Sequence, residues 1–154
     1  EETTVKDLGT LLGRGKAQNV FKLVDAVSDR DTLGALKRLG RLLEEGEPPL
    51  RILALLDRVV GQLLAAKELK RTRKTGAQAA SVLGAPVWRA DKLLAQSDRF
   101  LASELEQALR TLRECDRTLK TSAVPPRIVL EKWILGACRE KGHRGGANVP
   151  PRSG

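Results

Sequence analysis

Leucine and other aliphatic residues recur at steps of three and four along most of this chain, and that spacing restricts its fold more than any other feature. The clearest segment begins after Asp31, a candidate N-cap, and closes at Gly46. Its apolar positions all fall on one face of a helix: Leu33, Leu36, Leu39, Leu42 and Leu43. Because no segment alternates apolar and polar residues as a half-buried strand does, the sequence predicts an all-α fold, a compact multi-helix bundle.

Proline, glycine and capping residues indicate where the other helices begin and end. Pro48 and Pro49 are expected in the first turn of the longest helix, over about 50–70, where Gly61 suggests close approach by a neighbouring helix. A second helix is expected to start at Asn19, its N-cap, and a short helix over 76–83 to end at Gly84. Three further helices are expected to start at Pro86, at a capping box of Ser103 with Glu106, and at Pro125 and Pro126. The last helix has so little polar face that burial against several partners is expected.

Composition divides the chain into three parts. Residues 1–15 are predicted to form a helix carried over from the end of a preceding domain or linker, and residues 16–141 the helical domain itself. Residues 142–154, rich in Gly, Pro and Arg and almost without apolar side chains, are predicted to be a disordered tail. Since the first residue is not Met, we expect a fragment of a longer protein.

The residues give no support for catalysis. The single histidine, His143, lies in the Gly-rich tail, where no rigid scaffold can hold it in a triad or a zinc site. The phosphate-loop spacing is absent, and carboxylate pairs such as Glu44 with Glu45 are expected on solvated faces. Cys115 and Cys138 fall on apolar faces and are expected to be buried thiols. We predict no catalytic residues, no cofactor, no metal site and no enzyme activity.

A net charge of +9 favours contact with phosphates or with an acidic protein surface. Five cations crowd together after the longest apolar segment: Lys67, Lys70, Arg71, Arg73 and Lys74. They are interpreted either as a solvated helix end that complements the macrodipole or as a contact to phosphate or a partner. No apolar run is long enough to cross a bilayer and no signal peptide is present, so a cytoplasmic location without membrane contact is expected.

Residues 77–94 have the outline of a helix-turn-helix. Ala80 and Gly84 stand four apart, as the first helix and turn of such motifs often require. The match weakens at Ala90, where a bulky core residue is expected, and the second helix offers only Trp88, Arg89 and Lys92 near base edges. The alternative function is therefore a basic helical bundle that binds DNA on its own through this segment.

The order of several segments carries a family resemblance. They are Val20 to Val27, Glu45 to Leu53, Leu63 to Lys67, Ala79 to Pro86, and Leu105 to Thr121 with its Asp-x-x-Leu-Lys element. Taken in succession they resemble the C-terminal region of the bacterial DNA polymerase III delta subunit, which is part of a clamp loader. The resemblance assigns structural positions to Phe21, Pro49, Leu83, Gly84, Asp116, Leu119 and Lys120.

By that resemblance the domain is expected to be a collar module that assembles the clamp loader, the complex that places the sliding clamp on primed DNA. Its expected partners are the motor subunits and delta prime, with DNA as a further possible one. The resemblance places the grip on the sliding clamp in the N-terminal domain of delta and the ATPase motifs on other subunits. The basic stretch around Arg71 to Lys74 departs from the family pattern and leaves a DNA or partner contact open.

Overall fold

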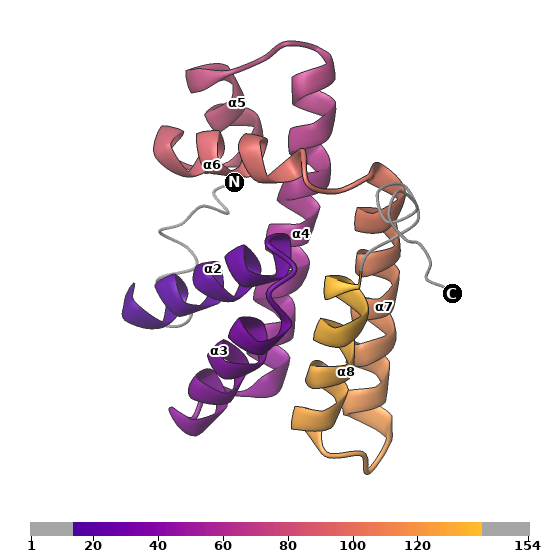
Figure 1. Cartoon of the computed structure of the whole chain (residues 1–154). Helices are drawn as coiled ribbons and strands as arrows, with labels where there is room; N and C mark the ends of the chain where they lie inside the picture. The colour runs from indigo at the N-terminus through magenta and orange to yellow at the C-terminus, as the bar shows by residue number, and fades with distance from the viewer. Residues whose placement is uncertain (1–13, 140–154) are drawn as a thin grey trace, which may run out of the picture.

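The computed structural model describes residues 14–139, and every regular element in that range is a helix (Figure 1). The helices are α2 (Arg14–Ser28), α3 (Thr32–Glu44), α4 (Pro49–Arg71), α5 (Gly76–Leu83), α6 (Val87–Ser97), α7 (Ala102–Thr121) and α8 (Pro126–Cys138). The all-α prediction is thus confirmed for this range. Of residues 1–15, expected as a separate preceding helix, 1–13 lie outside this range and Arg14 and Gly15 belong to α2. The tail from 142 onward and His143 also lie outside it.

The long helix α4 is the centre of the bundle (Figure 1). The antiparallel pair α7 and α8 lies along one side of it, α2 and α3 lie along another, and α5 and α6 pack against its C-terminal half. Ile52, Leu56, Val59 and Leu63 are at most 1% exposed, so α4 is buried by neighbours over most of its length. This burial contributes the largest share of the aliphatic core, because area removed from water drives packing.

Helix ends that depend on one nearby residue lie where the sequence predicts them. The Asp31 carboxylate accepts a hydrogen bond from the Gly34 N–H at 2.9 Å and caps α3. Pro49 is the first residue of α4, where its missing N–H leaves no helix hydrogen bond unmade. Gly84 ends α5 in the left-handed conformation, with φ of 67°.

Two predicted helix starts are wrong. Asn19 lies inside α2, which already includes residues 14–18, and therefore does not cap it. Helix α7 begins at Ala102, ahead of the expected capping box of Ser103 with Glu106. Glu104 performs the capping instead, because its carboxylate accepts the Leu101 N–H at 2.8 Å.

One expectation about packing needs correction and another is confirmed. Leu33 was predicted on the buried face of α3 but is 73% exposed, because it lies at the outer edge of that face. Helix α8 packs against several partners as predicted, namely α2, α3, α4 and α7, while Ile128 and Leu135 remain 45% and 48% exposed. Only the opposite side of α8 packs into the bundle, through residues such as Leu130 and Trp133.

Gly61 does not mark a close approach of helices, since a Cβ placed there would meet nothing within 4 Å. The glycine therefore only weakens α4, and we expect Gly61→Ala to stabilise the protein by about 0.5 to 1 kcal/mol. Gly84→Ala is the matched control and should instead destabilise by about 1 to 2 kcal/mol, because φ is positive there. Urea unfolding followed by circular dichroism measures both; a destabilised Gly61→Ala contradicts the prediction.

Candidate interaction surfaces

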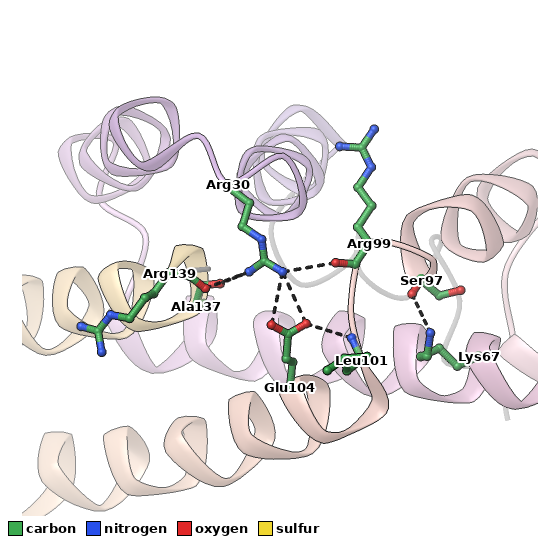
Figure 2. Close-up of polar contacts among 8 residues, drawn as sticks. All are labelled: Arg30, Lys67, Ser97, Arg99, Leu101, Glu104, Ala137 and Arg139. Carbon is green, nitrogen blue, oxygen red and sulfur yellow. Dashed lines mark hydrogen bonds and ion pairs between the residues drawn. The ribbon is translucent and has the colours of Figure 1, made fainter. Parts of the chain in front are cut away.

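The basic cluster splits into an inward part and an outward part. Lys67 donates from Nζ to the Ser97 carbonyl at 3.1 Å, so it satisfies a carbonyl at the C-terminal end of α6 (Figure 2). The Lys70 ammonium forms an ion pair with Asp98 at 2.6 Å. Both cations therefore hold α6 against α4, which is a structural role that their sequence positions alone do not reveal.

The outward part consists of Arg71, Arg73 and Lys74. Arg71 is paired with Glu68 one turn earlier, and this hydrogen bond raises the pKa of Arg71 and lowers that of Glu68. Arg73 and Lys74 are exposed in the turn between α4 and α5, and no ion pair joins either to another described residue. Of the five predicted contact residues, these two remain the most accessible to an anionic partner.

The helix-turn-helix-like segment turns its cations toward α2. The Lys92 ammonium pairs with Asp25 at 3.0 Å, and the Arg89 guanidinium lies over the Phe21 ring, 4.1 Å from its centroid. Ala90 is fully buried, Trp88 is 55% exposed, and the Lys92 side chain is 47% exposed but paired with Asp25. A helix whose polar groups are engaged by its own domain has little left with which to read base edges.

Arg89 is the least expected residue of the core. It is 1% exposed, and its Nε and Nη2 atoms have no hydrogen-bond partner. Burial lowers the pKa of this guanidinium, and the negative charge of Asp25 opposes the shift. The stacked Phe21 ring compensates only part of the cost of removing the cation from water.

Arg30 joins three parts of the chain that are distant in sequence, and we call this set of contacts the Arg30 clasp. Its guanidinium donates to the carbonyls of Ala137 at 3.2 Å and Arg139 at 3.1 Å, at the end of α8 (Figure 2). It also donates to the Arg99 carbonyl at 3.2 Å and forms an ion pair with Glu104 at 3.4 Å, at the start of α7. The cation thus stabilises the carbonyl end of one helix and the capping carboxylate of another.

The Arg30 clasp was not predicted from the sequence. The side chains of Arg30 and Glu104 are only 12% and 6% exposed, so the pair is nearly dry. Arg30 also has a φ of 61°, which an L-residue other than Gly rarely adopts. The chain turns sharply between α2 and Asp31, at a position where glycine is the usual residue. The presence of Arg30 there is the one local sign that its side chain has a structural role.

The family-pattern residues have structural positions in the bundle. Phe21 and Leu83 are 4% and 5% exposed, and Leu119 packs at the edge of the core. Asp116 and Lys120 form an ion pair at 3.1 Å within α7, with both side chains about half exposed. An exposed pair of this kind contributes about 0.3 to 0.5 kcal/mol, which leaves no strong structural reason for the pattern.

Six of the nine exposed large apolar side chains of the described residues lie in two groups, and Leu50, Leu101 and Val124 lie elsewhere. One group lies at the end of α5 and the start of α6: Val82, Val87 and Trp88. The other lies on α3 and α8: Leu33, Ile128 and Leu135. Clusters of this kind on a folded domain mark surfaces that another protein covers more often than scattered single residues do.

Within 14–139 no three His, Cys, Asp or Glu side chains come together as metal ligands, and no helix is long and apolar enough to span a membrane. Cys138 is buried and Cys115 half-buried, both as free thiols, and burial raises the pKa of each. A raised pKa keeps a thiol protonated and poorly nucleophilic at neutral pH.

Comparison with known proteins agrees with this picture. A family model described as the C-terminal domain of the DNA polymerase III delta subunit matches residues 17–137. The DNA polymerase III subunit delta of Bacillus subtilis is 27% identical over 135 residues, which span 88% of this chain and 39% of that protein. The solved structure of the Bacillus subtilis DNA clamp loader delta protein superposes with a TM-score of 0.75 at 26% identity, covering 86% of this chain and 39% of the other.

Proposed function

This chain belongs to the family of C-terminal domains of DNA polymerase III delta subunits, and we propose that it is the collar module through which such a protein joins a clamp loader. The observation that supports this most is the extent of the match, which covers nearly all of the described bundle, at residues 17–137. Because the chain spans 39% of its Bacillus subtilis relative, the proposal concerns this module and not the activity of a complete delta protein.

The surface of the module fits assembly better than catalysis. The described residues offer no metal-ligand group, and both thiols are kept protonated by burial. What the surface does offer is two groups of exposed apolar side chains, one on α5 and α6 and one on α3 and α8. A ring-shaped complex requires two different contact surfaces on each member, one for each neighbour.

The proposed partners are the motor subunits and delta prime, and the sliding clamp is expected to contact a different domain of delta. Native mass spectrometry of this chain mixed with those partners tests the proposal, with full-length delta as the positive control. We expect a stable complex that contains the chain. If full-length delta assembles and this chain does not, the collar proposal is abandoned.

DNA contact is a second candidate function, supported only by Arg73 and Lys74 in the turn between α4 and α5. We expect them to make sequence-independent phosphate contacts, so Arg73→Glu with Lys74→Glu should weaken binding to duplex DNA severalfold and flatten its salt dependence. The control is Lys67→Gln, because Lys67 is engaged by Ser97 and not available to DNA. Fluorescence anisotropy at two salt concentrations measures the effect, and equal binding by the wild-type and doubly substituted chains contradicts it.

A further inference from the structure

Three exposed apolar side chains lie on the neighbouring helices α3 and α8, and we call this set the α3–α8 seam: Leu33, Ile128 and Leu135. Ile128 and Leu135 are two helical turns apart, so they project from the same face of α8. Leu33 has an exposed fraction of 73%, the largest among the exposed apolar side chains of the described residues.

Two contacts fix the direction in which α3 and α8 pack. Arg30, two residues before α3, donates to the carbonyls of Ala137 and Arg139 at the end of α8. Further along, the Arg127 guanidinium at the start of α8 lies directly beside Gly40 in α3. The two helices are therefore antiparallel, as Figure 1 also shows, and Leu33 lies beside the half of α8 that carries Leu135.

The two helices that carry the seam are joined by hydrogen bonds of the Arg30 clasp. The Arg30 clasp immediately precedes α3 and binds the last carbonyls of α8, so it ties together the two helices that carry Leu33 and Leu135. A surface that is already ordered loses little conformational entropy on binding, which favours affinity for a given buried area. Apolar side chains that leave water at such a surface supply the attraction.

Basic side chains flank the seam on both helices, and Asp31, the N-cap of α3, is the exposed carboxylate two residues before Leu33. Lys37 lies one turn after Leu33, Lys132 one turn after Ile128, and Arg139 one turn after Leu135, and all three are exposed. The nearby acidic residue of α8, Glu131, is engaged by the Arg127 Nε at 3.0 Å. A partner that buries the apolar centre therefore meets positive charge around it, and complementarity requires carboxylates at its rim.

We propose that the α3–α8 seam is the surface through which this domain binds one neighbouring loader protein. The matching surface of that partner is an apolar patch with an acidic rim. The inference rests on the proposed collar function and adds the surface and the chemistry of the partner. A second copy of this chain is a poor occupant, because its own rim of Lys37, Lys132 and Arg139 repels an identical rim.

The test compares two variants of the 154-residue chain that carry the same added charge. Leu33→Glu with Leu135→Glu alters the seam, and Leu50→Glu with Ala54→Glu adds the same charge to the exposed side of α4, outside both apolar groups, as the control. All four side chains are exposed, so both variants should fold, which circular dichroism verifies. Titration with the motor subunits and delta prime then gives the affinity of each chain.

We expect the seam variant to bind one of these partners at least tenfold more weakly than wild type, while the control variant binds that partner unchanged. Lys37→Glu with Lys132→Glu should weaken the same contact and make its salt dependence shallower. Unchanged binding by the seam variant, equal losses in the seam and control variants, or a homodimer of the wild-type chain each overturn the assignment. If the wild-type chain binds none of the partners while full-length delta does, the collar proposal fails, and the seam proposal, which rests on it, fails with it. This outcome differs from failure of the seam alone, in which the wild-type chain and the seam variant bind equally well.

Discussion

Replacing Arg30 with alanine is expected to lower the free energy of unfolding by about 3 to 5 kcal/mol. The change removes the hydrogen bonds to the carbonyls of Ala137, Arg139 and Arg99 and leaves the Glu104 carboxylate almost fully buried without its cation. It also enlarges a cavity of about 230 Å³ that the Arg30 side chain helps to line, and cavities add to the cost. Urea unfolding monitored by circular dichroism measures the difference.

Two further substitutions separate the side chain of Arg30 from its backbone. Arg30→Gly loses the same contacts but relieves the left-handed φ of 61°, so it should be about 1 kcal/mol more stable than Arg30→Ala. Lys120→Ala, which breaks an exposed ion pair with Asp116, is the surface control and should cost about 0.3 to 0.5 kcal/mol. An Arg30→Ala chain no less stable than Lys120→Ala shows that the clasp does not hold the bundle together.

Replacing Arg89 with methionine should instead raise the free energy of unfolding, by about 1 to 2 kcal/mol. Methionine has a similar length, and it removes a cation whose Nε and Nη2 atoms are buried without partners. The loss of stacking on Phe21 offsets part of the gain, while Asp25 keeps its contacts to Lys92 at 3.0 Å and Gln96 at 2.5 Å.

Arg89→Lys is the control for that prediction. It retains the buried charge and loses the flat guanidinium that stacks on the ring, so it should destabilise the protein. The midpoints of thermal unfolding of the three chains order the effects, with methionine above wild type and lysine below it. A methionine variant less stable than wild type shows that the Arg89 contact with Phe21 outweighs the cost of burying the charge.

Features of the fold that depend on neighbouring residues were predictable from the sequence. The cap at Asp31, the start at Pro49 and the left-handed end at Gly84 each use chemistry within one turn of the helix. The capping box of α7 was placed too late because Leu101, which precedes the helix, has no side-chain oxygen and gives no signal. Glu104, inside the helix, makes the other hydrogen bond of a capping box, because its carboxylate accepts the Leu101 N–H.

Features that depend on distant residues were not predictable. The partners of Lys67 and Arg30 lie 30 to 109 positions away along the chain, and nothing local distinguishes these side chains from solvated cations. The leucine at 33 follows the core spacing yet is exposed, because helical spacing does not distinguish the outer edge of an apolar face from its buried centre. Family resemblance supplied the identity of the domain, while the contacts between distant helices needed the structure.

The Arg30 clasp also sets the order in which this domain can be completed during synthesis. Its bonds to Ala137 and Arg139 span 107 and 109 positions, so they form only after nearly all of the described chain has left the ribosome. Until then α2 can pack on α3, its main neighbour, but the contacts that join Arg30 to the end of α8 are missing. The domain therefore completes its fold, and can join a larger complex, only after α8 has been synthesised.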